Sequence, residues 1–244
     1  MQKQVEADRV SGKSRRGSRG LLLLSFYSLL LAGGSAWALL GESAPYLLVG
    51  QGLAQRVLSL AEGKVHFGAS RDTRDLVLKD CVRIADSLQG LALPTARRSA
   101  ALATCGEAAA RFAAESPTYS YARYVEALLA GERTDYDRMN EALSVSRSLA
   151  PTEQWLAELR VKLAESHLAD LHTAGLAGHE ADLALLVGSQ RGVRVIARRY
   201  VAVKAFRERI TAIAEKLSPD VQRRFVTALR EEAELLAPPE PPAR

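Results

Sequence analysis

Two cysteines are the residues of this 244-residue chain whose positions most clearly predict a bond. Residues 71–89 and residues 94–115 each carry apolar side chains at helical spacings, with Cys81 on the apolar face of the first segment and Cys105 on that of the second. Both cysteines lie twelve residues from Leu93, in the short connection, so they face each other if the helices are antiparallel. We therefore expect a Cys81–Cys105 disulfide, a bond typical of oxidising compartments. The alternative is two buried thiols that pack as small apolar side chains.

Four arginines form a concentrated group of charges in the C-terminal half. They lie at the start of residues 189–217, whose apolar side chains recur at helical spacings and predict one long amphipathic helix. Because a guanidinium group matches the geometry of phosphate and carboxylate, this is a candidate anion-binding site for a lipid headgroup, an acidic glycan or an acidic partner loop. The alternative is a solvated helix face paired with nearby glutamates. The four residues are Arg191, Arg194, Arg198 and Arg199.

The other polar residues show no catalytic or metal-binding motif. The four histidines, which we expect at the surface or at helix caps, are His66, His167, His172 and His179. No HExxH, GxSxG, P-loop or GxGxxG segment is present. Acidic residues are scattered among Arg and Lys at spacings typical of solvated helix faces. The sequence therefore assigns no catalytic residue, metal or cofactor, and an enzymatic interpretation would need an acid hidden among the many Asp and Glu.

A spacing of 34 residues relates two segments in the middle of the chain. The segments PTYSYARYVEALL and PTEQWLAELRVKL begin at Pro117 and Pro151, and Tyr121 of the first aligns with Trp155 of the second. Residues 131–135 then separate the helix of the first segment from another helix that ends before Pro151. The spacing predicts one helical hairpin followed by the start of a second.

This pattern resembles the tetratricopeptide repeat, in which each unit is a pair of helices with an aromatic residue on the first helix and a proline at the end. Residues 135–137, Asp-Tyr-Asp, are also similar to the turn into that family's second helix. The resemblance covers one full unit and the start of another, and it implies stacked hairpins with a concave face that binds peptide or protein segments. Tyr121, Tyr124 and Trp155 are then candidate partner-binding residues. A plain helical bundle without a groove is the alternative.

An uncharged segment near the N-terminus has the length of a membrane span. The segment comprises the twenty residues 21–40, LLLLSFYSLLLAGGSAWALL. As a helix it would be roughly 30 Å long, which is the thickness of the hydrocarbon core of a bilayer. The first twenty residues hold six basic and two acidic side chains, so the N-terminus is expected to stay cytoplasmic and the rest to be exported. The alternative is a cleaved signal peptide with a small-x-small site at Ala36-Trp37-Ala38.

The charge balance argues against a nucleic-acid-binding domain. The formal net charge is +5, but the first twenty residues contribute +4 of it (six basic minus two acidic), which leaves +1 for the other 224 residues. Ala and Leu dominate, and no alternating strand pattern of useful length occurs, so the predicted fold class is all-α.

These features predict a bitopic protein of the bacterial inner membrane with a periplasmic helical domain. We expect a non-enzymatic adaptor or assembly factor that binds a protein partner during envelope biogenesis, for example in export of polysaccharide or another surface component. The alternatives are a helical enzyme acting on an envelope polymer, and a subunit whose helix packs beside other membrane helices through Gly33 and Gly34. The expected parts are a basic tail (1–20), the anchor (21–40), an amphipathic helix and linker (41–70), helical hairpins (71–175), a C-terminal helical region (176–236) and a Pro-rich disordered tail (237–244).

Overall fold

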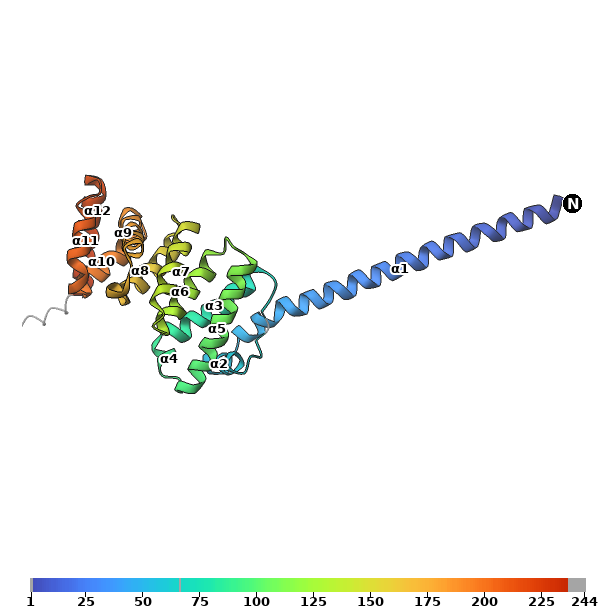
Figure 1. The fold of residues 1–244 in the computed structure, drawn as a ribbon. Coiled ribbons are helices and arrows are strands. Elements are labelled where there is room, and N and C mark those ends of the chain that lie inside the picture. Colours follow the sequence, from blue (N-terminus) through green and yellow to red (C-terminus); the bar gives the residue numbers. More distant parts are fainter. Residues whose placement is uncertain (1, 66, 237–244) are drawn as a thin grey trace, which may run out of the picture. The chain divides into compact units, whose positions relative to one another are not determined.

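The computed structural model describes residues 2–65 and 67–236, and every regular element in these ranges is helical (Figure 1). The all-α prediction is therefore confirmed for the described chain. The tail 237–244 and His66 lie outside these ranges. In chain order the helices are α1 (Gln2–Val49), α2 (Leu53–Ala61), α3 (Arg71–Asp86), α4 (Leu88–Leu91), α5 (Thr95–Glu115), α6 (Ser120–Glu132), α7 (Tyr136–Leu149), α8 (Gln154–Ser166), a 3-10 turn η1 (Leu168–Asp170), α9 (Thr173–Gly188), α10 (Gly192–Ala202), α11 (Lys204–Ala214) and α12 (Pro219–Leu236).

The chain divides into two compact units, of which the first comprises the residues up to Arg56 together with Val65–Val77. Its main element is α1, whose stretch Leu21–Leu47 has a mean hydropathy of 1.6 over 27 residues and is exposed throughout residues 21–40. This length and composition suit a membrane-crossing helix, although a signal sequence near the N-terminus passes the same test. The structure thus contains the apolar helix that the sequence predicts.

The carboxylate of Glu42 ties the end of α1 to the start of α3 within this first unit. It accepts hydrogen bonds from the backbone N–H groups of Ala69 (2.5 Å) and Ser70 (2.9 Å) and from the hydroxyl groups of Ser70 (2.6 Å) and Thr73 (3.1 Å). A carboxylate at this place satisfies donors that a helix start leaves unpaired. Glu42 thus lies just beyond the predicted span, residues 21–40, and inside the apolar stretch Leu21–Leu47.

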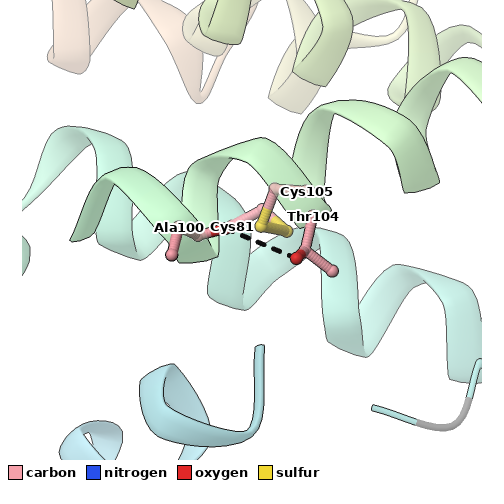
Figure 2. The surroundings of a disulfide bond; sticks show 4 residues. All are labelled: Cys81, Ala100, Thr104 and Cys105. Carbon is pink, nitrogen blue, oxygen red and sulfur yellow. Dashed lines mark hydrogen bonds between the residues drawn. A yellow bond between two sulfur atoms is a disulfide. The ribbon is translucent and has the colours of Figure 1, made fainter. Parts of the chain in front are cut away.

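The second unit comprises Val57–Lys64 and the residues from Leu78 onward, and it contains the cysteine pair. Figure 2 shows Cys81 on α3 and Cys105 on α5 joined across the two helices, beside the hydrogen bond from the Thr104 hydroxyl to the carbonyl oxygen of Ala100 (3.4 Å). The two Cα atoms are 5.7 Å apart, within the usual range for a disulfide. The structure therefore agrees with the expected pairing.

The first predicted helix, residues 71–89, ends earlier than expected, at Asp86. Ser87 is extended and its hydroxyl accepts the N–H of Gly90 (3.0 Å), which starts the short helix α4 in the expected connection. The guanidinium group of Arg98 donates to the carbonyl oxygens of Ile84 (3.3 Å) and Ala85 (3.0 Å), the groups that the end of α3 leaves unpaired. Local caps, which the apolar spacing does not report, set this boundary.

The middle of the second unit consists of two successive pairs of helices. Helix α6 packs on α7 and α8 packs on α9, while α6 also contacts α8 and α7 contacts α9. The first helices of the two pairs, α6 and α8, begin at Ser120 and Gln154, which are 34 residues apart, as the sequence predicts. In Figure 1 the overlapping helices α6 and α7 lie between α5 and the pair α8 and α9.

The C-terminal region contains two helices where one long helix, residues 189–217, was predicted. The chain breaks at Val203, which is extended (φ −119°, ψ 103°), so α10 and α11 are separate. Arg207 donates to the carbonyl oxygens of Tyr200 (2.8 Å) and Val201 (2.7 Å) and thereby satisfies the end of α10. Residues of α8 to α12 share one buried apolar cluster, and α9 continues through the expected boundary at 175/176.

Candidate functional site

Two glycines on α9 bring this helix close to α7. A Cβ atom added at Gly175 would lie 2.5 Å from Oδ1 of Asn140, and one at Gly178 would lie 3.2 Å from Cδ of Arg147. Asn140 is buried and fixes the approach, since its amide donates to the carbonyl oxygens of Tyr136 (2.8 Å) and Asp170 (2.9 Å) and its oxygen accepts the N–H of His172 (2.8 Å). The small residues therefore determine how far apart the two helices lie.

A pocket of about 400 Å³ lies beside this close approach, between α7, α8 and α9. Much of its wall is made of small residues on α9, including Ala174, Ala177 and Ala181, and Leu143 adds an apolar surface from α7. The wall also carries four charged or titratable side chains, which are Arg147, Arg160, His179 and Asp182. The pocket thus combines room for a small group with polar side chains that can recognise it.

A buried ion pair stands at the polar side of this pocket. Arg160 is 2% exposed and Asp182 is 1% exposed. The guanidinium group of Arg160 binds both carboxylate oxygens of Asp182, at 2.7 and 2.9 Å, in a bidentate arrangement. Arg147 lies 3.5 Å from the same carboxylate and donates to the carbonyl oxygen of Gly178 (3.0 Å). Two guanidinium groups therefore share one carboxylate.

Next to this pair, Glu165 on α8 and His179 on α9 form a second buried contact. Nε2 of His179 lies 2.6 Å from Oε1 of Glu165, and Nε of Arg209 lies 3.3 Å from the same oxygen. Burial alone raises the pKa of Glu165, but the hydrogen bond with His179 and the charges of His179, Arg209 and Arg199 outweigh it and lower this pKa below its ordinary value. Glu165 is therefore held as a carboxylate and serves as an ion-pair partner.

Two buried nitrogen atoms of pocket-lining residues are left without a hydrogen-bond partner among the described residues. They are Nη1 of Arg160 and Nδ1 of His179. A guanidinium nitrogen such as Nη1 of Arg160 is always a donor. Nδ1 of a histidine accepts in the neutral imidazole and donates in the protonated one. Most buried polar groups have partners, so these two atoms are unusual, but both are closed to solvent. The arginine of the pocket that a ligand can reach is Arg147, whose side chain is 26% exposed.

Of the three aromatic residues predicted to bind a partner, two lie in the core. Tyr121 and Tyr124 are 3% and 1% exposed, and burial, as the largest cause, raises the pKa of Tyr124 far above its ordinary value. The ring of Tyr121 packs on Tyr124 at 6.1 Å and on Trp155 at 5.3 Å, measured between ring centroids. Trp155 is 46% exposed, so it alone among the three offers a surface to a partner.

The four arginines of the predicted anion site have different surroundings. Arg198 binds the buried carboxylate of Glu232 (2.9 Å), which raises the pKa of Arg198. Arg199 lies over the ring of Phe206 (5.1 Å to the centroid), and burial lowers its pKa. Arg191 and Arg194 are exposed at the start of α10. Arg198 and Arg199 therefore make structural contacts, and any anion site on this helix would depend on Arg191 and Arg194.

The sequence interpretation missed the pocket residues, and it placed His179 at the surface or a cap, although His179 is 3% exposed. One signal was present in the sequence. Arg160 lies four residues after Leu156 and four before Ala164, on the apolar face of α8, and it lies 34 residues after Glu126, which is also buried. A charge on an apolar helix face needs a partner, and such a pattern indicates a buried polar site.

Comparisons with protein-family models, with curated proteins and with solved structures give no match for this chain.

Proposed function

We propose that this protein is a membrane-anchored adaptor of the bacterial cell envelope, with a periplasmic helical domain that binds a protein partner. The apolar helix α1 and the Cys81–Cys105 pair support an exported domain that is attached to the inner membrane. The two pairs of helices, with first helices 34 residues apart, support stacked hairpins of the tetratricopeptide kind, which commonly bind protein segments. Assembly of the envelope, such as export of a polysaccharide or another surface component, is the proposed setting.

The observation that carries this function is the state of the polar groups at the pocket between α7, α8 and α9. The carboxylate of Asp182 is already bound by Arg160, and Glu165 is bound by His179 and Arg209. A general acid would need a raised carboxyl pKa, whereas the pKa of Glu165 is lowered. Donor groups without partners, beside carboxylates that are already held in ion pairs, suit recognition of a ligand better than proton transfer.

Crosslinking in intact membranes tests the adaptor function. A photo-reactive amino acid replaces Ala177, which is exposed at the rim of the pocket, in the full-length chain. The matched control carries the same amino acid at Thr227, an exposed position on α12. We expect a protein adduct of defined mass from position 177 and not from position 227, and mass spectrometry then identifies the partner.

Absence of a protein adduct from position 177, together with absence of one from Trp155, the other exposed candidate, would contradict the adaptor function. An adduct with an envelope polymer that becomes shorter during incubation would instead support the enzymatic alternative. An adduct formed equally at position 177 and at the control position 227 would indicate nonspecific collision and would also count against a defined partner surface.

A further inference from the structure

We infer that the pocket between α7, α8 and α9 recognises a carboxylate group on a peptide segment of the partner. This inference rests on the proposed adaptor function and adds the chemistry of the group that is bound. The carboxylate belongs either to an internal acidic side chain or to a chain terminus, since both present the same planar pair of oxygens. Recognition then requires Arg147 and Arg160.

The first reason is the excess of positive charge at the pocket. Arg147 and Arg160 supply two guanidinium groups, and the only carboxylate among the lining residues is that of Asp182. Asp182 uses its oxygens on Nε and Nη2 of Arg160, which leaves Nη1 of Arg160 without a partner. Arg147 contacts Asp182 and Gly178 through Nε, so its two terminal nitrogens have no hydrogen-bond partner among the described residues. A bound carboxylate would accept from the terminal nitrogens of Arg147, which is 26% exposed, while the buried guanidinium group of Arg160 adds positive charge behind it.

The second reason is that the net charge fits a monoanion. The two arginines and one aspartate that line the pocket leave a single positive charge among these three side chains. A carboxylate balances this single charge, whereas a dianionic phosphate would leave an excess negative charge in the site. The planar guanidinium group also matches a carboxylate in two parallel hydrogen bonds.

The third reason is the shape of the wall. On α9 the small side chains of Ala174, Ala177 and Ala181 line the pocket beside His179 and Asp182, and the pocket holds about 400 Å³. Such a wall lets a peptide backbone approach the helix while one side chain reaches the arginines.

Four variants of the full-length chain in lipid nanodiscs isolate the charge of the pocket. Ser144→Glu places a tethered carboxylate at an exposed lining position, three residues from Arg147 on the same helix, and Ser144→Gln is its neutral match. Arg147→Gln removes one guanidinium group from the pocket. Arg194→Gln removes an exposed arginine on α10 and controls for loss of charge elsewhere.

Methyl NMR of alanine reports binding at the pocket. The probes are an end-blocked alanine peptide with a central glutamate, the same peptide with glutamine, an alanine peptide with a free C-terminal carboxylate, and inorganic phosphate. We expect the methyl signals of Ala174, Ala177 and Ala181 to shift in a saturable way with one or both carboxylate peptides below ~10 mM, and not with the glutamine peptide. The two carboxylate peptides distinguish an internal acid from a chain terminus.

The variants should change this response in a defined order. Arg147→Gln should weaken binding of the carboxylate peptide about tenfold, because one charge-assisted contact is lost, and Ser144→Glu should weaken it at least as much. Ser144→Gln, which adds the same bulk without the charge, should weaken binding clearly less than Ser144→Glu, and Arg194→Gln, which lies outside the pocket, should leave the affinity within about twofold. Unchanged methyl signals of the buried residues Ala122 and Ala127 show that each variant is folded.

Three results would overturn the inference. They are no saturable shift with either carboxylate peptide, equal shifts with the glutamine peptide, or a response to phosphate alone that depends on Arg147. If crosslinking from position 177 succeeds while the carboxylate peptides fail, the adaptor function stands and the carboxylate specificity is wrong. If the peptides bind but no partner adduct forms in membranes, the pocket chemistry stands and the adaptor function is wrong.

Discussion

Arg160 and Asp182 form a buried pair whose two members depend on each other. Their side chains are 3% and 2% exposed, and the guanidinium group binds both carboxylate oxygens. Removal of one partner leaves the other charge buried, which costs more than the pair itself contributes. We expect Arg160→Leu to lower the free energy of unfolding by about 3–5 kcal/mol, measured by denaturant unfolding followed by circular dichroism.

The double variant Arg160→Leu/Asp182→Leu is the matched control for this pair. Because it removes both charges and keeps apolar volume in their place, it should be clearly more stable than Arg160→Leu alone. A double variant no more stable than the single one would show that the cost comes from lost packing of the arginine stem and not from the orphaned carboxylate.

The lowered pKa of Glu165 predicts a specific dependence of stability on pH. A carboxyl group with a folded-state pKa below its ordinary value of 4.5 contributes stability above pH 4.5 and loses it as pH falls through the lower folded-state pKa. Glu165→Gln removes this contribution, so the free energy of unfolding of the variant should fall less steeply below pH 4.5 than that of the unmodified chain. Thermal melts between neutral and acidic pH measure this slope.

Glu141→Gln is the control for this measurement, because Glu141 is exposed on α7 and should keep the slope of the unmodified chain. Parallel acid profiles for Glu165→Gln and the unmodified chain would mean that His179 and Arg209 do not stabilise the carboxylate in the folded state. The carboxylate would then have no linkage to folding, and its role as an ion-pair partner would be wrong.

At the residue scale, the sequence predicts which two side chains meet only where simple helix geometry relates their positions. Cys81 and Cys105 were identified because two helices and a short connection place them at equal distances from the turn. Arg160 and Asp182 belong to the paired helices α8 and α9, and their meeting depends on how α9 rotates about its own axis. Close approaches at Gly175 and Gly178 set this rotation, and apolar spacing does not encode them.

At the scale of elements, the Cys81–Cys105 disulfide should be formed in the exported protein and should hold α3 and α5 together. The bond links residues 24 apart, and in the chain-entropy model a loop of this size contributes on the order of 3 kcal/mol. Alkylation of freshly isolated protein, followed by reducing and non-reducing gels, should show both sulfur atoms protected until reduction. Cys81→Ala/Cys105→Ala should melt at a lower temperature than the oxidised chain.

The unmodified chain after reduction is the internal control for the double cysteine variant, and the two should melt at similar temperatures. Two thiols that react freely with the alkylating reagent before reduction would show that the pair is not oxidised in its compartment. The cysteines would then be buried apolar side chains, which was the alternative interpretation of their sequence positions.

The boundaries of elements show where the apolar pattern stops being informative. The pattern continues through Val203, since Ile196 of α10 and Phe206 and Ile210 of α11 all contribute to one buried cluster. The break is stabilised by Arg207, whose side chain binds the last carbonyl oxygens of α10. A surface arginine with this role looks in the sequence like any solvated charge, so one continuous helix was the simpler prediction.

At the scale of the whole molecule, the all-α fold class and the apolar N-terminal helix followed from composition and apolar periodicity. The 34-residue spacing correctly located the starts of α6 and α8, because prolines and turn residues mark them locally. The continuity of α9 with the C-terminal core was not predictable in the same way, since it depends on contacts between α9 and helices as distant in sequence as α12.

The last prediction concerns the attachment of the whole protein to the membrane. The first twenty residues hold six basic and two acidic side chains, a bias that predicts a cytoplasmic N-terminus. The helix α1 continues without a break through the small-x-small sequence at residues 36–38 and on to Glu42, which caps the start of α3. We therefore expect the span to remain uncleaved, with the domain beyond it on the periplasmic side. Intact mass measurement and N-terminal sequencing of protein purified from membranes should find the N-terminal residues still attached. A mature chain that starts at Leu39 and is released by spheroplast formation would instead establish a signal peptide. In that case the adaptor would be a soluble periplasmic protein, and the basic tail would serve only for export.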